Sequence, residues 1–474
     1  MKRFLSGDEA LAEGVRLARP QVISAYPITP QTVVVERLSE MVESGQLEAE
    51  YIHVESEHSA LSAAMGASAT GARTFTATSS QGLLYMAEVL TYAAGGRFPI
   101  VMMNANRATA LPWNIYGDQR DSLALLDHGW IQVYAQDNQE ALDLALMAYA
   151  IAEDPRVSTP FMVNLDGFAL THTYENVDVP EPEQADAFLP PYQTGNRFDF
   201  EHPVNMGYSA GPEFNRYFKY EAHRAMLGVA EVIAEVEQRF AAAFGRRYPG
   251  LIEAYRTEDA DAVLVTLGSI AGLARACVDE RRAAGQRVGL VRIRYMRPFP
   301  ARELACALAG AKAVGVLEKD ISFGAEGTVF TNVNSALHQA ALPVPTLNFI
   351  GGLGGDDISL EQMERVFATL EDLAANGTAP RDSRGDCDSP SASAQSPQPA
   401  QPAQPVAPKN VSRETSRVVF LGVNDADPAA QPAPPQPNPA QPVPPQPAPP
   451  QPNPAQPAPS DLAVAEANAT EGGR

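Results

Sequence analysis

The hydroxyl of Thr29 lies in a constrained stretch, AYPITPQT at residues 25–32, in which Pro27 and Pro30 stand three positions apart. Each proline fixes its own φ and pushes the residue before it out of the α region, so the backbone around Thr29 would lose little entropy on holding a ligand. A threonine followed by proline is also typical of a helix N-cap with proline at the first helical position. These residues alone leave both interpretations open.

Three further polar features have side chains suited to chemistry: Glu57, the SSQG stretch at 79–82, and Arg107. A positioned carboxylate can hold or transfer a proton, and a planar guanidinium can bind a small carboxylate through two parallel hydrogen bonds. Two of the three have a simpler explanation. Glu57 could be a first-turn acid that favours the helix dipole, and Arg107 could pair at the surface with Asp118 or Asp121.

These candidates must be positioned by the elements around them. Apolar runs at 21–25, 51–55, 73–79, 99–105 and 160–166 alternate with helix-like stretches at 31–44, 57–70, 82–92 and 138–153. Such alternation predicts a parallel sheet covered by helices on both faces. Ligands bind outside the carboxyl ends of the strands in such a sheet. The four candidates, each of which follows one of the first four runs, should therefore meet at one rim.

The rest of the chain divides by pattern. A segment rich in Pro, Asp and Glu at 176–206 should be a long connection, and 217–244 should be a helix. A second alternation follows, with apolar runs at 262–268, 288–293, 313–319 and 345–352. We therefore predict an α/β protein with a parallel-sheet domain at 1–255, which includes the long connection, and a smaller α/β domain at 256–377.

The C-terminal part, 378–474, changes abruptly to Pro, Gln, Ala and Asn, and the motif QPAPPQPNPAQ begins at residue 431 and again at residue 446. Such a composition has too little apolar surface to offset chain entropy, so we predict a disordered Pro/Gln/Ala-rich tail. The apolar cluster VSRETSRVVFLGV at 411–423 interrupts it. This cluster could instead dock on the folded body.

Composition excludes several classes of function. The 474 residues are 45% apolar and 19% charged, which is enough to build real cores. With 35 Lys and Arg against 57 Asp and Glu, the formal charge of −22 should repel nucleic acid and anionic lipid. No window approaches the roughly 18 apolar residues of a membrane span. The spacing of the three cysteines, Cys277, Cys306 and Cys387, is too wide for a disulfide framework or a four-thiolate cluster, so we expect a cytoplasmic protein. From the charge and the lack of an apolar window we expect no nucleic-acid or membrane partner.

Two other motifs lack the context they need. GYSAG at 207–211 matches the GxSxG nucleophile elbow, but that motif requires a strand before it and a helix after it, and here Pro212 follows. GGLGGDD at 351–357 matches neither a dinucleotide-binding motif nor a P-loop, so we expect a flexible connection there. No histidine stands at metal-motif spacing, and we predict no metal site in this chain.

Several motifs, taken in order, resemble those of a known family. They are YPITPQT, ESEHSA, SSQGLLYM, NANRATA, YGDQRDS, GWIQVYAQDNQEALD and DGFALTH, followed by RYMRPFP at 294–300 and LEKDISFGAEG at 317–327. Over about residues 1–375 the chain resembles the alpha subunit of pyruvate:ferredoxin oxidoreductase, also called pyruvate synthase. The Pro-rich tail is not part of the family pattern.

The resemblance implies oxidative decarboxylation of pyruvate with coenzyme A to acetyl-CoA and CO2, with thiamine diphosphate as cofactor and ferredoxin as the electron acceptor. It implies a pyrimidine-binding-type thiamine diphosphate domain followed by a transketolase C-terminal-like domain. Glu57 would then be both catalytic and cofactor-binding, because it hydrogen-bonds the aminopyrimidine ring. Thr29 and Arg107 would hold the substrate carboxylate.

The chain has no GDG motif followed by a distant Asn, which in thiamine enzymes binds the diphosphate through a divalent ion. The resemblance therefore implies beta, gamma and delta-type partner subunits that share the thiamine diphosphate and carry Mg and iron–sulfur clusters. Two alternatives stay open. One is a 2-oxoglutarate or branched-chain 2-oxoacid enzyme of the same family, and the other is a non-catalytic scaffold with a Pro-rich interaction tail. A scaffold would have no need of Thr29, Glu57 and Arg107 together.

Overall fold

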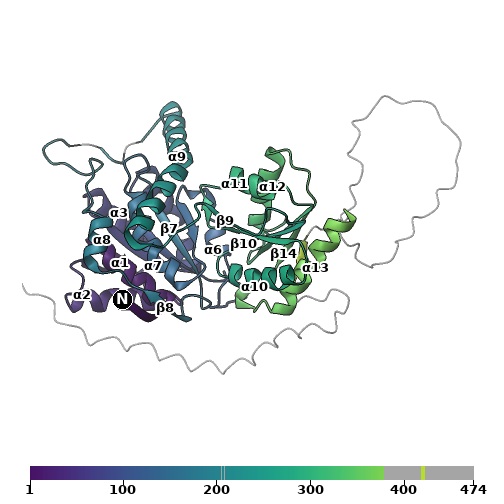
Figure 1. Cartoon of the computed structure of the whole chain (residues 1–474). Helices are drawn as coiled ribbons and strands as arrows, with labels where there is room; N and C mark the ends of the chain where they lie inside the picture. The colour runs from purple at the N-terminus through teal and green to yellow at the C-terminus, as the bar shows by residue number, and fades with distance from the viewer. Residues whose placement is uncertain (204, 208, 378–417, 422–474) are drawn as a thin grey trace, which may run out of the picture. The chain divides into compact units, whose positions relative to one another are not determined.

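The first sheet of the protein carries the predicted alternation of strands and helices. The structure, a computed structural model, describes residues 1–203, 205–207, 209–377 and 418–421 (Figure 1). The strands of the first sheet are, in spatial order, β12 (Tyr295–Arg297), β6 (Ile131–Tyr134), β7 (Phe161–Asp166), β5 (Val101–Asn106), β4 (Thr74–Thr78), β2 (Val22–Ala25) and β3 (Glu50–His53). All neighbours pair in parallel except β12, which is antiparallel to β6. The prediction of a parallel α/β sheet is confirmed.

Helices cover both faces of this sheet. They are α1 (Gly7–Ala18), α2 (Thr32–Glu43), α3 (Glu57–Ala69), α4 (Ser80–Tyr85), α5 (Ala87–Gly95), α6 (Arg120–Leu123), α7 (Asn138–Ala152), α8 (Pro182–Phe188) and α9 (Pro212–Phe244), with a 3-10 turn at Leu126–His128. The period of two along β5 sends Val101 and Met103 into the core with α1, α2 and α7, while Met102 joins the core with α3 and α5. Every residue of β5 is buried, which explains why it reads as a continuous apolar run.

A small antiparallel pair, β1 (Lys2–Ser6) and β8 (Tyr174–Asp178), lies outside the two larger sheets. The predicted long connection at 176–206 therefore begins inside a strand and also contains α8. The predicted helix at 217–244 ends at the expected residue but begins at Pro212.

The second sheet forms the smaller α/β part of the chain. Its strands are, in spatial order, β15 (Val418–Phe420), β14 (Thr346–Ile350), β13 (Ala313–Glu318), β10 (Ala262–Leu267), β11 (Val288–Ile293) and β9 (Ile252–Tyr255). Its helices are α10 (Ile270–Ala283), α11 (Ala301–Leu308), α12 (Thr328–Gln339) and α13 (Leu360–Asn376), with a 3-10 turn at Leu353–Gly355. The core residues of α10 and α13 pack together on one face, and those of α11 and α12 pack on the other (Figure 1).

The chain crosses between the two sheets. Strand β9 precedes the predicted boundary at residue 255, yet it pairs antiparallel with β11 of the second sheet. Strand β12 follows that boundary, yet it pairs with β6 of the first sheet. Each sheet therefore includes a strand from the sequence region of the other.

The structure describes residues 418–421 of the Pro-rich tail. Val418–Phe420 forms β15, which pairs in parallel with β14, and the Leu421 amide donates a hydrogen bond to the Ile350 carbonyl at 2.8 Å. Leu421 also packs against the core beneath α10 and α13. The prediction of a disordered tail is therefore corrected for 418–421, where the alternative of a docked apolar segment holds. The rest of 378–474 lies outside the described residues.

Candidate active site

The four polar candidates follow four neighbouring strands. In the first sheet β3, β2, β4 and β5 lie side by side, and their carboxyl ends precede Glu57, Thr29, the 79–82 stretch and Arg107 respectively. Parallel strands place these ends at one edge of the sheet. The structure brings Thr29 and Arg107 into direct contact, since Nη1 of Arg107 donates to the Thr29 carbonyl oxygen at 2.9 Å.

Arg107 is a buried residue whose guanidinium is oriented by hydrogen bonds to main-chain carbonyls. It is only 5% exposed, and its Nε donates to the carbonyl of Asn114 at 3.1 Å. The ring of Trp113 lies 5.6 Å from its Cζ. Burial lowers the pKa of Arg107, and the charge of Asp121 partly offsets this effect. A surface ion pair is therefore not the environment of Arg107, because its side chain is buried and binds main-chain oxygens.

Thr29 is exposed and lies outside the helix that follows it. Helix α2 begins at Thr32, and its N-cap is Gln31, whose side chain makes no capping hydrogen bond. The interpretation of Thr29 as an N-cap is therefore wrong. No hydrogen bond of the Thr29 hydroxyl is found among the described residues, and the carbonyl of the same residue binds the Arg107 guanidinium.

Glu57 is the first residue of α3 and lies against Gly82. The N-cap of α3 is Ser56, whose hydroxyl accepts the Ser59 amide at 3.2 Å. A Cβ on Gly82 would stand 2.6 Å from Oε1 of Glu57 and 2.7 Å from Oγ1 of Thr78, so only glycine lets these two side chains approach the backbone of α4 so closely. In the described part of the chain, Glu57 forms no ion pair with a basic side chain, and the buried Thr78 hydroxyl has no partner. The result is a half-buried carboxylate that packs against Gly82, close to an unpartnered hydroxyl.

Asp121 joins the 79–82 stretch to Arg107, a role the sequence did not indicate. Its Oδ2 accepts the backbone N–H of Ser80 at 3.0 Å and that of Arg107 at 3.1 Å, and its Oδ1 accepts from Nδ2 of Asn106 at 2.8 Å. Burial raises the pKa of Asp121, although these hydrogen bonds oppose the shift. The hydrogen bond from the Ser80 amide to Asp121 stabilises Ser80 in the left-handed region, with φ +50°. The only sequence signal of Asp121 is its place in the motif YGDQRDS.

The glycine-rich stretch of the second sheet reaches this rim. The expectation of a flexible connection at 351–357 is corrected, because the turn binds the loop that follows β5. Nδ2 of Asn114 donates to the Gly354 carbonyl at 2.9 Å, and the Gly355 amide donates to the Gly117 carbonyl at 2.7 Å. These contacts fix the turn in one place.

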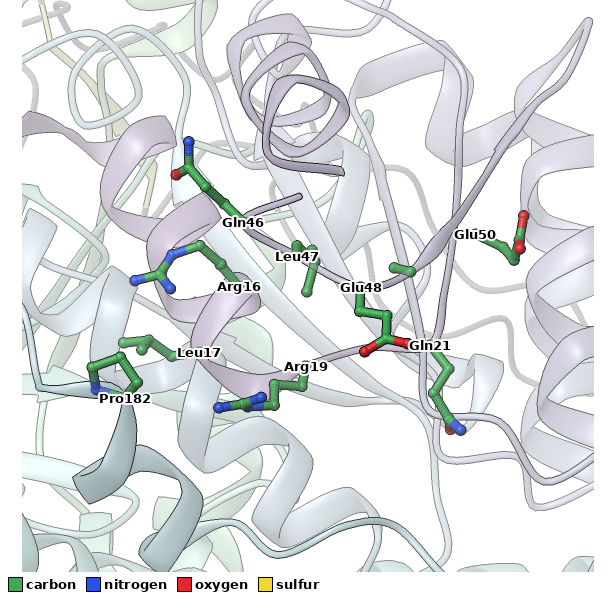
Figure 2. Close-up of a pocket in the computed structure, with 10 residues that line it drawn as sticks. Arg16, Leu17, Arg19, Gln21, Gln46, Leu47, Glu48, Glu50 and Pro182 are labelled. Carbon is green, nitrogen blue, oxygen red and sulfur yellow. The ribbon is translucent and has the colours of Figure 1, made fainter. Parts of the chain in front are cut away.

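A cavity of about 630 Å³ lies elsewhere on the chain (Figure 2). It is lined by Gln21, directly before β2, and by Glu50, the first residue of β3, so it opens at the amino ends of these strands. Its arginines are already paired, Arg16 with Glu13 and Arg19 with Asp186. No candidate site residue lines it.

Within the described residues, no group of three or more His, Cys, Asp or Glu side chains is arranged to hold a metal ion. None of the helices in the described ranges is long and apolar enough to cross a membrane.

Family models match both α/β parts of the chain. Residues 13–238 match the family described as "Pyruvate flavodoxin/ferredoxin oxidoreductase, thiamine diP-bdg". Residues 260–363 match "Pyruvate:ferredoxin oxidoreductase core domain II".

Curated relatives match along nearly their whole length. The "Pyruvate synthase subunit PorA" of Methanothermobacter thermautotrophicus is 46% identical over 369 residues, which cover 78% of this chain and 95% of that protein. The protein of the same name from Pyrococcus horikoshii is 46% identical over 378 residues, with 80% and 95% covered. The "Ketoisovalerate oxidoreductase subunit VorA" of the same organism is 43% identical over 378 residues, again with 80% and 95% covered.

A solved structure shares the fold. It is the 2-oxoglutarate:ferredoxin oxidoreductase from Magnetococcus marinus with 2-oxoglutarate, coenzyme A and succinyl-CoA bound. The TM-score is 0.60 at 20% identity, and the match covers 77% of this chain and 65% of that chain, so the likeness concerns the fold alone.

Proposed function

The chain belongs to the pyruvate:ferredoxin oxidoreductase family, and from this premise we propose that it is the alpha subunit of an enzyme that oxidises pyruvate. The enzyme converts pyruvate and coenzyme A to acetyl-CoA and CO2, and ferredoxin receives the electrons. The observation that carries the proposal is the contact between Arg107 and Thr29 at the strand rim, the same rim at which Glu57 follows β3. The names of the relatives that match over 95% of their length support it.

Arg107 and Thr29 bind the carboxylate of the substrate. A guanidinium has five N–H donors, and two of those of Arg107 are used by the carbonyls of Asn114 and Thr29. The remaining three and the unpartnered Thr29 hydroxyl suit a small planar carboxylate. Since the two carbonyls orient the guanidinium before the substrate arrives, binding loses little side-chain entropy.

Glu57 and Gly82 fit the pyrimidine ring of thiamine diphosphate. The absent Cβ of Gly82 lets the Glu57 carboxylate lie directly against α4, and the nearby Thr78 hydroxyl has no hydrogen-bond partner among the described residues. When bound, the cofactor supplies the nucleophilic carbon and the electron sink that decarboxylation of a 2-oxoacid requires. The Glu57 carboxylate would hydrogen-bond the bound ring and would stabilise a proton on the ring nitrogen.

Partner subunits complete the enzyme. The chain matches relatives that are named as subunits, and it contains three widely spaced cysteines and no GDG motif followed by a distant Asn. We assign the diphosphate, its Mg ion and the iron–sulfur clusters to beta, gamma and delta-type partners. The complex acts in the cytoplasm, in keeping with the acidic, cysteine-poor composition.

A branched-chain 2-oxoacid is the second candidate substrate. The relative from Pyrococcus horikoshii named as a ketoisovalerate oxidoreductase subunit is 43% identical, which lies within the 42–46% of those named as pyruvate synthase subunits. The ratio of kcat/KM for pyruvate and for ketoisovalerate in the assembled enzyme separates the two. A ratio above one supports pyruvate.

The test of the proposed function is purification of the native complex through this chain. We expect thiamine and iron to copurify, and we expect ferredoxin reduction that depends on both pyruvate and coenzyme A. The isolated chain is the control and should not turn over. A complex that contains this chain but lacks thiamine and this activity would leave the scaffold hypothesis in its place.

A further inference from the structure

Asn114 connects the Arg107 side chain to the second sheet. Its carbonyl accepts from Nε of Arg107 at 3.1 Å, and its Nδ2 donates to the Gly354 carbonyl at 2.9 Å. Its Oδ1 also accepts the Tyr116 amide at 2.6 Å. The Asn114 side chain therefore stabilises the loop whose carbonyl accepts from Arg107. That side chain is in turn held by Gly354, which lies more than two hundred residues away in the sequence.

The neighbouring glycine of that turn, Gly355, is fitted to the same loop. Its φ is +79°, and its amide donates to the Gly117 carbonyl at 2.7 Å. A Cβ at this position would stand 2.4 Å from Cβ of Tyr116, so any other residue would push this part of the loop away. The Tyr116 carbonyl accepts the Ala108 amide at 2.9 Å. A shift of Tyr116 would therefore be transmitted to Ala108, the residue next to Arg107.

The loop after β13 of the second sheet contacts the C-terminal end of the loop that begins at Arg107. The Lys319 carbonyl, after β13, accepts the Gln119 amide at 2.8 Å. Oδ2 of Asp118 accepts the Gly354 amide at 3.3 Å. The loop that begins at Arg107 is thus held at Asn114, Gly117 and Asp118 by the turn after β14, and at the following residue by the loop after β13.

We propose that Asn114 is a positioning residue for Arg107, and that the Gly354–Gly355 turn of the second sheet sets the geometry with which the substrate carboxylate is bound. The inference rests on the proposed function, since it gives Arg107 a carboxylate to bind. The inference gives the second α/β part of the chain a role in substrate affinity, although the two residues proposed to bind the carboxylate, Arg107 and Thr29, both belong to the first part. Displacement of a binding group by about 1 Å can lower a rate about 100-fold, so small shifts of the loop have large effects.

The test uses Asn114→Asp and Gly355→Ala in the assembled enzyme. Asn114→Asp replaces the donor to the Gly354 carbonyl by an oxygen, and Gly355→Ala introduces the collision with Tyr116. Each should raise the KM for pyruvate roughly 10- to 100-fold. The KM for coenzyme A should stay unchanged. Gly285→Ala is the matched control, because Gly285 has φ +88° in the same α/β part and its added Cβ meets no atom within 4 Å.

Arg107→Lys separates this inference from the proposed function. If Arg107→Lys raises the KM for pyruvate while Asn114→Asp and Gly355→Ala do not, the positioning role is wrong and the proposed function stands. If Arg107→Lys itself has no effect on that KM, both the carboxylate assignment and the positioning role fail. In support of the inference, adding Asn114→Asp to Arg107→Lys should raise the KM by much less than Asn114→Asp does alone.

Hydrogen exchange of the purified full chain gives a readout independent of activity. The backbone amides of residues 107–118 should exchange faster in Asn114→Asp and Gly355→Ala than in the unaltered chain. Gly285→Ala should leave that segment unchanged. Equal exchange in all four proteins would overturn the inference.

Discussion

At the scale of single residues, Glu57 and Gly82 depend on each other, because the carboxylate occupies space that a side chain at Gly82 would fill. Glu57→Gln should preserve the fold and lower turnover about 10²- to 10⁴-fold, since a neutral amide cannot hold the proton of the cofactor ring. The measurement is pyruvate-dependent ferredoxin reduction by the assembled enzyme. Glu88→Gln is the control, because Glu88 pairs with His58 and its side chain is 71% exposed. Near-normal turnover in Glu57→Gln would reduce Glu57 to a residue that favours the dipole of α3.

The hydroxyl of Thr29 is the second residue-scale test. Thr29→Val removes the hydroxyl at similar volume, and a hydrogen bond to a charged group contributes about 1.5–3 kcal/mol. We therefore expect the KM for pyruvate to rise roughly 10- to 150-fold, at 1.4 kcal/mol per tenfold. Thr29→Ser keeps the hydroxyl and should have a milder effect. If Thr29→Val lowers only the melting temperature, the substrate carboxylate lies elsewhere.

Some residues of this site are predictable from the sequence, and others are not, for a physical reason. Thr29 and Arg107 each follow an apolar run, so the rule for parallel sheets is enough to place them at one rim. Asp121 follows an irregular loop that has no periodicity, and its role depends on two separate segments, one at Ser80 and one at Asn106 and Arg107, that meet at its carboxylate. Asn114 owes its role to Gly354, which belongs to the other sheet. Such long-range convergence leaves no local pattern.

At the scale of elements, strands were predictable where both faces are apolar. Strands β5 and β10 are buried throughout and read as continuous runs. Strand β6 was missed although it is fully buried, because Gln132 lies in its interior and donates to the Leu125 carbonyl at 3.3 Å. A polar side chain satisfied by a distant partner breaks the apolar pattern without breaking the strand. Strand β12 is only three residues long and depends on β6 for its pairing.

Strand β15 gives the element-scale prediction. Truncation after residue 410 removes β15 and Leu421, whereas truncation after residue 423 keeps them. Because each backbone hydrogen bond is worth roughly 1 kcal/mol net, the shorter chain should melt at a lower temperature than the longer one. Calorimetry of the two truncated chains measures this difference. Leu421→Asp in the full chain should lower the melting temperature in the same direction, and identical melting of all three with the unaltered chain would mean that β15 adds no stability.

At the scale of the whole molecule, a buried ionic network connects the two sheets. Glu140 of α7 binds Arg292 of β11 at 2.7 Å and Arg294 at 2.8 Å, and Arg294 also binds Glu237 of α9 at 2.5 Å. All four side chains are buried. The network, together with the exchange of β9 and β12, joins the second sheet to the first. A fixed junction is what the contact between the Gly354–Gly355 turn and the Arg107 loop requires.

The network predicts how stability depends on acidity. Burial alone would raise the pKa of Glu140, but Arg292 and Arg294 outweigh it and lower the pKa from 4.5 to about 2. A carboxylate whose folded pKa lies below its unfolded value stabilises the fold above the unfolded pKa, and this contribution is lost as the pH falls toward the folded pKa. Stability linked to Glu140 should therefore disappear between pH 4.5 and about pH 2.

Glu140→Gln isolates this contribution from other carboxyl groups. The variant leaves two buried arginines without their shared carboxylate, and breaking a buried pair in this way costs about 3–5 kcal/mol. Asp137, whose pKa is raised to about 6 by burial and by Glu140, titrates above the window. Because Glu140 itself helps to raise the pKa of Asp137, melting of the two proteins should show a difference that is constant only above about pH 6 and that shrinks between pH 4.5 and about pH 2. A difference that persists unchanged to the lowest pH would mean that packing at Glu140, and not its charge, joins α7 to β11.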